Sequence, residues 1–536
     1  MPDGTVRLVE ARSHEFEIAD PGPLPLGRIR DELAVAFTVA GDRRAKRIRR
    51  TWLDTFDWRL YRAGLTLQYV GGSGPGELVL TGGGGQQLTA RARQARWPCL
   101  SGGLPPGPLR DRVAAVAGLR ALLPRVSVVS QVSELWLLNE DDKTVARIAV
   151  DAMTLPAPQG AAIAARLAVT EVRGYPAAAR RAGRILTGTG GVVPSRQTAL
   201  DAALSAAGQR AADYTGKVVV PLLPAMPGAE AVSAILLQQL DALEVNVDGV
   251  LHDIDTEFLH DLRVAVRRTR TALKLLGHVL PGELTLRFAS EFRWLGDTTT
   301  PLRDRDVQLL SLPSMAARLV AASPDDLRPL VAYLTRRRAT ERQKLSRALR
   351  SARFDAMVGD WRKALLVPRA AGHASGPHAA GHASGPRAAE LSADRTRRAH
   401  ARVLRLGSAI TASSPAESLH TLRKRCKELR YVLEFFASLH DPQLYAAVLA
   451  DLKRLQDCLG EFQDSEVQSA EIQSLAPAML ARQAAPASTL LAMGELAAQL
   501  GTRQRAARAE FADRFARFAG GAGRDRMAAL TAGDSG

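Results

Sequence analysis

The stretch that decides the fold of the second half of the chain is Phe258–Leu276, FLHDLRVAVRRTRTALKLL. Its histidine and its cationic residues recur every three or four positions, a spacing that returns to one face of an α-helix. The opposite face carries leucine and valine, so the pattern predicts a helix that buries one side and presents a row of cations on the other. The members of this row are His260, Arg263, Arg267, Arg270 and Lys274.

The same pattern returns 160 residues later in Leu419–Phe436, LHTLRKRCKELRYVLEFF. That offset also relates Glu291–Asp297 to Asp451–Asp457, and it relates the later acidic residues Asp304 and Asp464. Segments that keep one register over this distance predict an internal duplication. The second row consists of His420, Arg423, Lys427 and Arg430, with Lys424 beside it.

These segments resemble the two halves of a CHAD domain. The resemblance rests on HDLRVAVRRTR at 260–270, LRDRDV at 302–307 and HTLRKRCKELRYVLEFF at 420–436, and it covers about residues 229–520. It implies two four-helix bundles related by a pseudo-two-fold axis, with basic faces lining a channel that binds inorganic polyphosphate. Two positions depart from the duplication, because Gly460 corresponds to Thr300 and Glu434 corresponds to Lys274.

The cationic rows favour binding of a multivalent anion over catalysis, because no nucleophile, P-loop or metalloprotease motif accompanies them. Arginine offers a planar fork that matches phosphate oxygens. Each histidine either donates to phosphate or is a core side chain satisfied by a neighbour. The predicted polyphosphate-binding residues are His260, Arg263, Arg267, Arg270, Lys274, Arg303, His420, Arg423, Lys424, Lys427 and Arg430.

Two further sets of residues accompany these rows. Asp304 and Asp464 are expected to orient neighbouring guanidinium groups rather than to act as bases. A long helix is expected over residues 327–350, and its arginines either form a solvated face or extend the basic surface. The residues that would extend the surface are Arg336, Arg347 and Arg350.

Composition narrows the partner. The chain has 536 residues, 72 Lys and Arg against 55 Asp and Glu, and a net charge of +17. This balance is typical either of an arginine-rich proteome or of a protein with a polyanionic partner, namely polyphosphate, nucleic acid or an anionic membrane surface. Aromatic residues make up 5% of the chain, and the only one among the rows is Tyr431. Because single-strand binding needs stacking aromatics, polyphosphate is preferred and nucleic acid is the less favoured alternative.

Cysteine content and hydropathy bear on location. The cysteines Cys99, Cys426 and Cys458 form no CxxC motif, which argues against a disulfide framework or a zinc site and suits a reducing compartment. No uncharged apolar run approaches the length of a membrane span. We therefore expect a cytoplasmic protein, and association with polyphosphate granules is a further hypothesis. The oligomeric state is left open.

Residues 1–205 have a different texture, with short β-type stretches divided by Gly, Pro and Asp turns. They predict an α+β domain rich in antiparallel sheet. HEFEIAD at 14–20, TWLDTFDWRLYRAGLTLQ at 51–68, LVLTG at 78–82 and LAVTEVRG at 167–174 resemble a CYTH domain. That family implies a β-barrel tunnel that binds, and often hydrolyses, triphosphate with the help of divalent cations.

The chemistry of that tunnel is only partly kept. The family motif Glu-x-Glu-x-Lys is matched by Glu15 and Glu17, but Ala19 stands at its third position, and the late acidic pair survives only as Glu171. We therefore predict a non-catalytic, CYTH-like accessory domain without a cofactor. The alternative is a Mg²⁺- or Mn²⁺-dependent triphosphatase that holds its metal through Glu15, Glu17 and Glu171. In that case Arg91, Arg93 and Arg147 would restore part of a basic tunnel.

The predicted organisation is thus an α+β antiparallel barrel-like or tunnel-like domain followed by an all-α domain of two four-helix bundles. A proline-containing linker is expected at 206–228, the first helical repeat at 229–366 and the second at 389–520. Between the repeats, residues 367–388 contain AAGHASGP twice and are expected to be a disordered insert. The tail 521–536 is expected to be flexible.

Overall fold

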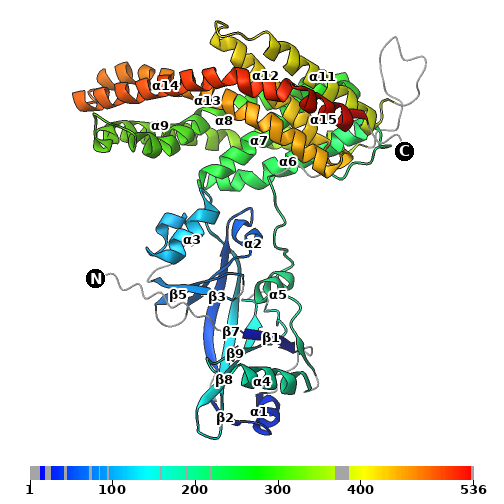
Figure 1. Ribbon diagram of the computed structural model, residues 1–536, viewed down its shortest axis with the longest axis vertical. Coiled ribbons are helices and arrows are strands. Elements are labelled where there is room, and N and C mark those ends of the chain that lie inside the picture. Colours follow the sequence, from blue (N-terminus) through cyan, green and yellow to red (C-terminus); the bar gives the residue numbers. More distant parts are fainter. Residues whose placement is uncertain are drawn as a thin grey trace. The chain divides into compact units, whose positions relative to one another are not determined.

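The chain divides into two compact units, Met1–Gly216 and Lys217–Gly536, which are described separately below. A computed structural model of the protein (Figure 1) describes residues 13–18, 26–41, 45–71, 75–83, 85–92, 96–156, 160–188, 191–216, 220–367 and 385–532. Arg93 and residues 368–384 of the predicted insert lie outside these ranges.

The first unit is built on one antiparallel sheet. The strand order is β10-β1-β9-β8-β7-β3-β4-β5-β6, with β2 paired to β7. The strands are β1 (Ser13–Ile18), β2 (Thr38–Gly41), β3 (Lys46–Asp54), β4 (Thr66–Gly71), β5 (Gly76–Thr81), β6 (Gln87–Ala92), β7 (Leu123–Leu138), β8 (Thr144–Thr154), β9 (Arg166–Glu171) and β10 (Val192–Pro194). The α+β class is confirmed.

The sheet does not close into the expected barrel, since its end strands β6 and β10 are not paired with each other in the described part of the chain. Apolar packing covers its faces instead. Side chains of α1 (Leu26–Ala34) and α4 (Pro176–Gly188) pack with Phe16 and Ile18 on one face. Helix α5 (Ala199–Ala206) packs against Trp52 and neighbouring strand residues in a separate cluster. Two shorter helices complete the unit, α2 (Arg59–Arg62) and α3 (Pro108–Ala117).

The second unit is helical, and its helices fall into two series of five. The first series is α6 (Gly228–Leu251), α7 (Thr256–Leu276), α8 (Gly282–Ala316), α9 (Arg328–Leu349) and α10 (Ala352–Leu366). The second is α11 (Ala388–Ser408), α12 (Ala416–Phe435), α13 (Pro442–Leu480), α14 (Ala487–Ala519) and α15 (Gly521–Ala532). The described residues of the first repeat therefore contain one α-helix more than the four expected, whereas the predicted bounds of the second repeat hold the four helices α11–α14.

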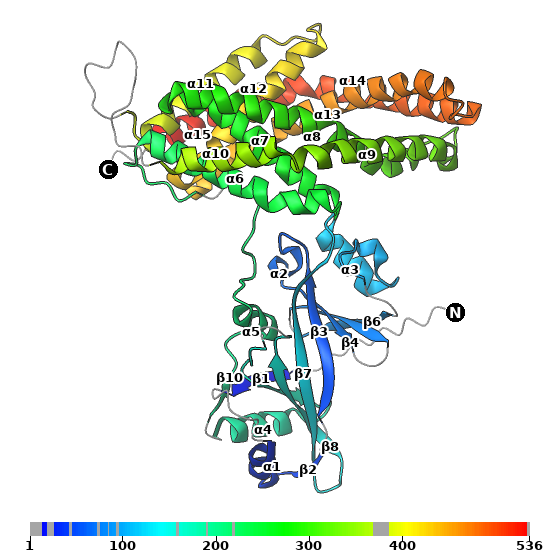
Figure 2. The same cartoon turned by 180° about the vertical axis from the view of Figure 1, so that it is seen from behind.

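The ends of the two repeats pack together. Helices α9 and α14 lie side by side in both views (Figures 1 and 2), and a shared apolar cluster joins them to α8 and α13. The predicted amphipathic character of α7 is confirmed, because Leu259, Leu262, Val266, Leu273 and Leu276 are all buried. The corresponding apolar residues of α12 are buried as well. These helices therefore bury their apolar faces in the bundle, and their basic faces point outward.

The prediction of a flexible tail is wrong over residues 521–532, which form α15. Met527 and Leu530 of this helix are buried in the core of the second repeat. They are three residues apart and so share a helix face, and burial of that face outweighs the glycines in this segment.

Parts of the predicted linker are also held in place. The Trp58 indole donates to the Asp213 carboxylate at 2.7 Å, and Arg62 donates to the carbonyl oxygens of Ala212 and Tyr214. At the other end, the Leu222 amide donates to Ser438 Oγ at 3.0 Å. The described linker residues are therefore docked on the unit that each adjoins.

Candidate anion-binding surface

The two basic helices α7 and α12 meet about a local two-fold axis. Arg268 pairs with Glu434 at 2.7 Å, and Lys274 pairs with Glu428 at 2.6 Å. Under the 160-residue offset Arg268 corresponds to Glu428, and Lys274 corresponds to Glu434. The duplication therefore exchanges one ion pair with the other. Because the lower-numbered residue of α7 pairs with the higher-numbered residue of α12, the helices run in opposite directions across this contact.

Arg267 and Lys427 correspond to each other under the same offset, so they lie on opposite sides of the axis. The guanidinium group of Arg267 reaches across to α12, where it lies 5.7 Å from the ring centre of Tyr431. Burial is the main cause that lowers the pKa of Lys427 to about 8, and the cations Arg423 and Arg267 lower that pKa further, while Asp464 opposes them. No carboxylate of the described residues forms an ion pair with Arg267 or Lys427. The two basic rows therefore form one surface, whose centre is a pair of like charges.

On the first half of this surface, Arg263 is anchored by α8. Its Nη1 donates to Thr299 Oγ1 at 3.0 Å and to Thr300 Oγ1 at 2.8 Å. These two hydroxyls are themselves tied to the helix backbone, because both donate to the carbonyl oxygen of Gly296. The guanidinium group is thus positioned by neutral oxygens, which leave its charge uncompensated.

Four arginines gather around this point. Burial lowers the pKa of Arg263 to about 10, and Arg267, Arg303 and Arg270 lower it further, whereas the carboxylate of Asp304 opposes them. The pKa of Asp304 is itself raised, chiefly by burial, although Arg263 draws it down. Asp304 therefore lies within electrostatic reach of this cluster, with the arginines in clear excess.

Glycine at two different places lets arginine approach the neighbouring helix. A Cβ atom added to Gly296 would lie 2.7 Å from Nη1 of Arg270, so a larger residue there would displace the end of that arginine side chain. In the second repeat a Cβ atom at Gly460 would lie 3.8 Å from Nη2 of Arg423. The departure at these positions has a physical consequence, because Thr300 accepts a hydrogen bond from Arg263, whereas Gly460 has no side chain to offer Arg423.

The second half of the surface is anchored by α13. Arg423 donates from Nη1 to Gln463 Oε1 at 3.2 Å and from Nη2 to Asp464 Oδ1 at 2.9 Å. The carboxylate that was expected to orient a guanidinium group is thus bonded to one. The exposed residue Lys424 lies on the same helix, next to this arginine in sequence.

Three of the remaining predicted cations are bonded to other groups of the protein, which makes them less available to a bound anion. Lys274 is held by Glu428, and Arg430 pairs with Glu434 at 2.7 Å. Arg303 donates to the carbonyl oxygen of Thr256 at 3.1 Å. Lys274 and Arg430 therefore flank the surface, each sharing its carboxylate with a second cation, because Glu428 also pairs with Arg425 and Glu434 also pairs with Arg268.

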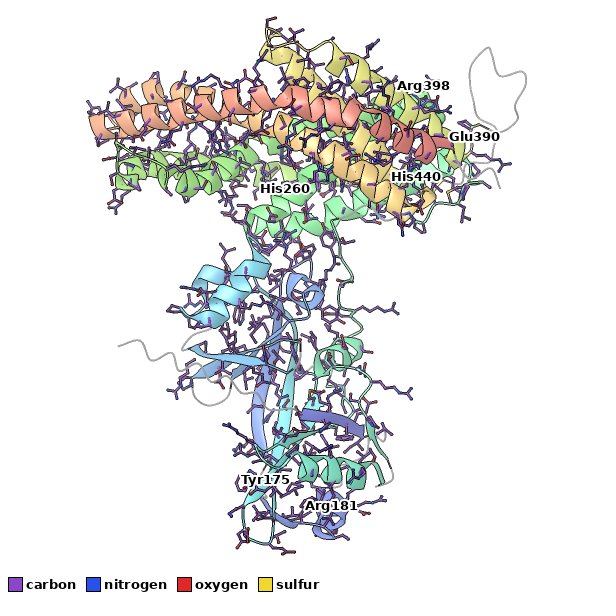
Figure 3. All side chains as sticks on the ribbon, in the orientation of Figure 1. Tyr175, Arg181, His260, Glu390, Arg398 and His440 are labelled. Atoms are coloured by element: carbon purple, nitrogen blue, oxygen red, sulfur yellow. The ribbon has the colours of Figure 1, made fainter. Side chains whose placement is uncertain are left out.

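The two predicted histidines occupy equivalent places. His260 and His420 are each the fifth residue of their helix, and each is half-buried. Figure 3 labels His260 on the helical unit. Each histidine stands three residues before an anchored arginine, which is Arg263 on α7 and Arg423 on α12. Each histidine therefore lies about one helical turn from that arginine.

Whether residues of α9 form a solvated face or extend this surface stays a prediction. Arg336, Arg347 and Arg350 are exposed, and Arg350 donates to Ser346 Oγ one turn back on its own helix. A residue that sequence reasoning passed over, Arg338, instead fixes α9. In the sequence Arg338 is one of several arginines in a row, and only its position on the folded helix distinguishes it from its neighbours.

Arg338 joins three segments of the first repeat. Its guanidinium contacts both carboxylate oxygens of Asp253 at 2.8 and 2.6 Å, and its Nε donates to Asp306 at 2.6 Å. Asp306 is only 1% exposed. Burial raises the pKa of Asp306 while Arg338 lowers it. This arginine is therefore a structural cation.

The structure does not bring together the carboxylates of the alternative metal site in the first unit. The register pairs Glu15 with Ala168 and Glu17 with Arg166, so both glutamates project from one face of the sheet. Glu171 projects from the opposite face, where His14 lies 3.3 Å from it. Within the described ranges, no group of three His, Cys, Asp or Glu side chains is placed to hold a metal ion.

A cation of the sheet itself bonds to one of these glutamates. Arg166 is 6% exposed and donates to Glu15 Oε2 and to Ser195 Oγ, both at 2.8 Å. Ser195 in turn donates to Glu17 at 3.2 Å. Of the arginines proposed for a tunnel, Arg147 and Arg91 lie on β8 and β6, which are separate strands of the open sheet.

Among the helices that the structure describes, none has the length and apolar character that a membrane span requires.

Comparisons with known proteins bear on the helical unit. The family model described as "CHAD domain" matches residues 234–473. A solved CHAD domain from the plant Ricinus communis is 27% identical, with 56% of this chain and 95% of that chain covered and a TM-score of 0.45. PptA from Streptomyces chartreusis is 19% identical, with 54% and 99% covered and a TM-score of 0.41.

For the N-terminal part, a proposed adenylate cyclase from Bacillus halodurans is 13% identical, with 36% of this chain and 96% of that chain covered and a TM-score of 0.26. No curated protein matches the chain. The duplicated basic helices and the family match agree on one assignment: the chain contains a CHAD domain at residues 234–473.

Proposed function

We propose that the helical unit binds inorganic polyphosphate at the surface where α7 and α12 meet. The observation that carries this proposal is that Arg267 and Lys427 flank the local axis and that neither has a carboxylate as an ion-pair partner among the described residues. Like charges held close repel each other, and the repulsion grows where water is partly excluded. A bound polyanion would convert that repulsion into attraction.

The shape of the cations favours phosphate oxygens. Arg263 and Arg423 are held by hydrogen bonds from one side, so their planar groups are pre-oriented before a ligand arrives. Charge-assisted bonds from arginine to phosphate are among the stronger hydrogen bonds in proteins. A chain of phosphates offers one such acceptor group after another.

The surface lacks what a nucleic acid needs. Tyr431 is 6% exposed, and the guanidinium groups of Arg267 and Arg268 lie within 6 Å of its ring centre, at 5.7 and 5.9 Å. Its ring is thus covered rather than available for stacking on a base. Polyphosphate, which has charge without bases, suits this surface better than single-stranded DNA or RNA.

A competition titration tests the proposal. Long-chain polyphosphate is set against single- and double-stranded DNA at about 150 mM salt, where the screening length is roughly 8 Å. We expect polyphosphate to win, and we expect Arg267→Ala/Lys427→Ala to abolish the preference. Arg328→Ala removes an exposed cation on α9 that pairs with Asp325, and serves as the matched control. Equal binding of all three polyanions by the wild-type protein would refute the proposal.

For the first unit we propose an accessory role without catalysis. Arg166 already pairs with Glu15, and Ser195 donates to Glu17, so two of the carboxylates that a divalent cation would need are engaged. The triphosphatase alternative predicts Mg²⁺- or Mn²⁺-dependent release of phosphate from tripolyphosphate, lost in Glu15→Ala/Glu17→Ala. We expect no such release, and its detection would reverse this assignment. Association with polyphosphate granules follows from the binding proposal and is tested by co-localisation of the tagged protein, with Arg267→Ala/Lys427→Ala as the comparison.

A further inference from the structure

We infer that the polyphosphate surface consists of two equivalent half-sites that share Arg267 and Lys427 at their boundary, so that it binds a linear phosphate chain in either direction. This inference rests on the proposed function and goes beyond it, because it states how many short ligands the surface holds and which ligand geometry it selects.

The first ground for this inference is that the duplication relates the two ion pairs between α7 and α12. Arg268–Glu434 and Lys274–Glu428 have the same separation to within 0.1 Å, and each becomes the other under the duplication. Whatever lies on one side of the axis thus has a counterpart at an equivalent place on the other. The local symmetry extends through the contact itself and is not confined to the order of the helices.

The second ground is that each repeat holds an anchored arginine at an equivalent place. Arg263 and Arg423 correspond under the offset, and each is fixed by the long helix that follows its own. The anchors differ in chemistry, with threonine hydroxyls in the first repeat and Asp464 in the second. The two half-sites are therefore equivalent in position, and the carboxylate makes the second somewhat weaker for anions.

The third ground is the antiparallel course of α7 and α12. Arg263 precedes Arg267 by one turn, and Arg423 precedes Lys427 by one turn, which is about 6 Å along each helix. Because α7 and α12 run in opposite directions, the two anchored arginines lie at opposite ends of the surface, with the shared pair between them. A chain that crosses the axis meets cations in the order Arg263, Arg267 with Lys427, then Arg423.

The ligand that matches this order has no direction. A linear polyphosphate is the same read from either end, whereas a nucleic-acid strand has distinct 5′ and 3′ ends. A two-fold surface offers each end of a polyphosphate an anchored arginine at an equivalent place, so the chain binds in both orientations. A short phosphate reaches only one half-site, and linking two such contacts in one chain raises affinity through effective concentration.

Titration calorimetry with the full chain tests this inference. Tripolyphosphate is expected to bind the helical surface twice and a long polyphosphate chain once, with the long chain on the order of a hundredfold tighter or more. Arg263→Ala and Arg423→Ala are each expected to remove one tripolyphosphate and leave the other. Any tripolyphosphate bound by the first unit would persist in the double variant and is subtracted on that basis. Arg328→Ala is again the control.

The outcomes separate the two proposals. If either single variant removed all tripolyphosphate bound by the helical surface, the surface would be one composite site, which overturns the half-sites and leaves polyphosphate binding intact. Failure of long polyphosphate to bind at all would remove the proposed function, and this inference with it. Where an alanine variant does not fold, Arg263→Lys or Arg423→Lys keeps the charge but loses the fork, and should weaken one of the two tripolyphosphate sites selectively.

Discussion

The sheet unit and the basic surface of the helical unit treat arginine in opposite ways. In the sheet unit Arg166 is paired with Glu15 at 2.8 Å and Arg50 with Asp151 at 2.5 Å. On the basic surface of the helical unit, the exposed Arg267 and the half-buried Lys427 have no ion-pair partner among the described residues. Paired cations stabilise the fold that holds them, while clustered cations raise its energy until an anion arrives. The comparison therefore assigns structure to the first arrangement and ligand binding to the second.

The largest effect on the free energy of unfolding is expected for a paired cation inside the helical unit. Its substitution tests whether a structural cation is marked by its ion pair or by the unit in which it lies. Arg338→Ala leaves the carboxylate of Asp306 buried without its partner, and removal of one member of such a pair costs about 3–5 kcal/mol. Urea unfolding should report this loss in the free energy of unfolding. The neighbouring exposed Arg336→Ala should change it by about 0.5 kcal/mol or less. A small effect of Arg338→Ala would show that pairing does not mark structural cations here.

The next effect should come from the clustered pair. Arg267→Ala/Lys427→Ala is expected to lower polyphosphate affinity by about a hundredfold, because charge-assisted hydrogen bonds contribute about 1.5–3 kcal/mol each. Removal of two cations should also flatten the slope of log affinity against log salt by about 1.5 to 2, as counterion release predicts. The free energy of unfolding should stay the same or rise, since a repulsive contact is lost. A clear loss of stability would contradict the comparison.

A smaller effect is expected from the paired cation of the sheet unit. Arg166→Gln frees Glu15 and removes the hydrogen bond to Ser195, which should lower the free energy of unfolding by about 1–3 kcal/mol. Mn²⁺ should then raise the melting temperature of the variant while leaving the wild type unchanged, because only the variant has unpaired carboxylates. Arg91→Gln, on β6, is the matched control. An equal response of both proteins to Mn²⁺ would show that Arg166 does not replace a metal.

The smallest effect should be the pH dependence of binding. Burial and neighbouring cations lower the pKa of Lys427 to about 8, so its charge is present at pH 7 and is lost as the pH rises past 8. Polyphosphate affinity should therefore fall between pH 7 and pH 9 by less than tenfold, in part because the bound anion restores the proton. Lys427→Arg should flatten this profile, since arginine keeps its charge. A profile that stays steep in that variant would place the titrating group elsewhere.

Several features of the fold followed from the sequence because they depend on local periodicity. The apolar faces of α7 and α12 and their cationic opposite faces lie where the three-and-four spacing places them. The α+β class of the first unit followed from turn residues between short β-type stretches. The prediction of a flexible tail failed because burial of Met527 and Leu530 depends on the neighbouring helices and not on the segment itself.

The sequence by itself determined which residues are cationic, on which helix faces they lie and that the pattern occurs twice, because these follow from a period of 3.6 residues and from counting. Only the tertiary structure decided which cations remain uncompensated. It paired Lys274 with Glu428, gave Arg338 to Asp306, set Glu171 on the opposite sheet face from Glu15 and left Arg267 beside Lys427. Charge compensation depends on distances between residues far apart in the chain, and helix spacing or strand alternation carries no information about those distances.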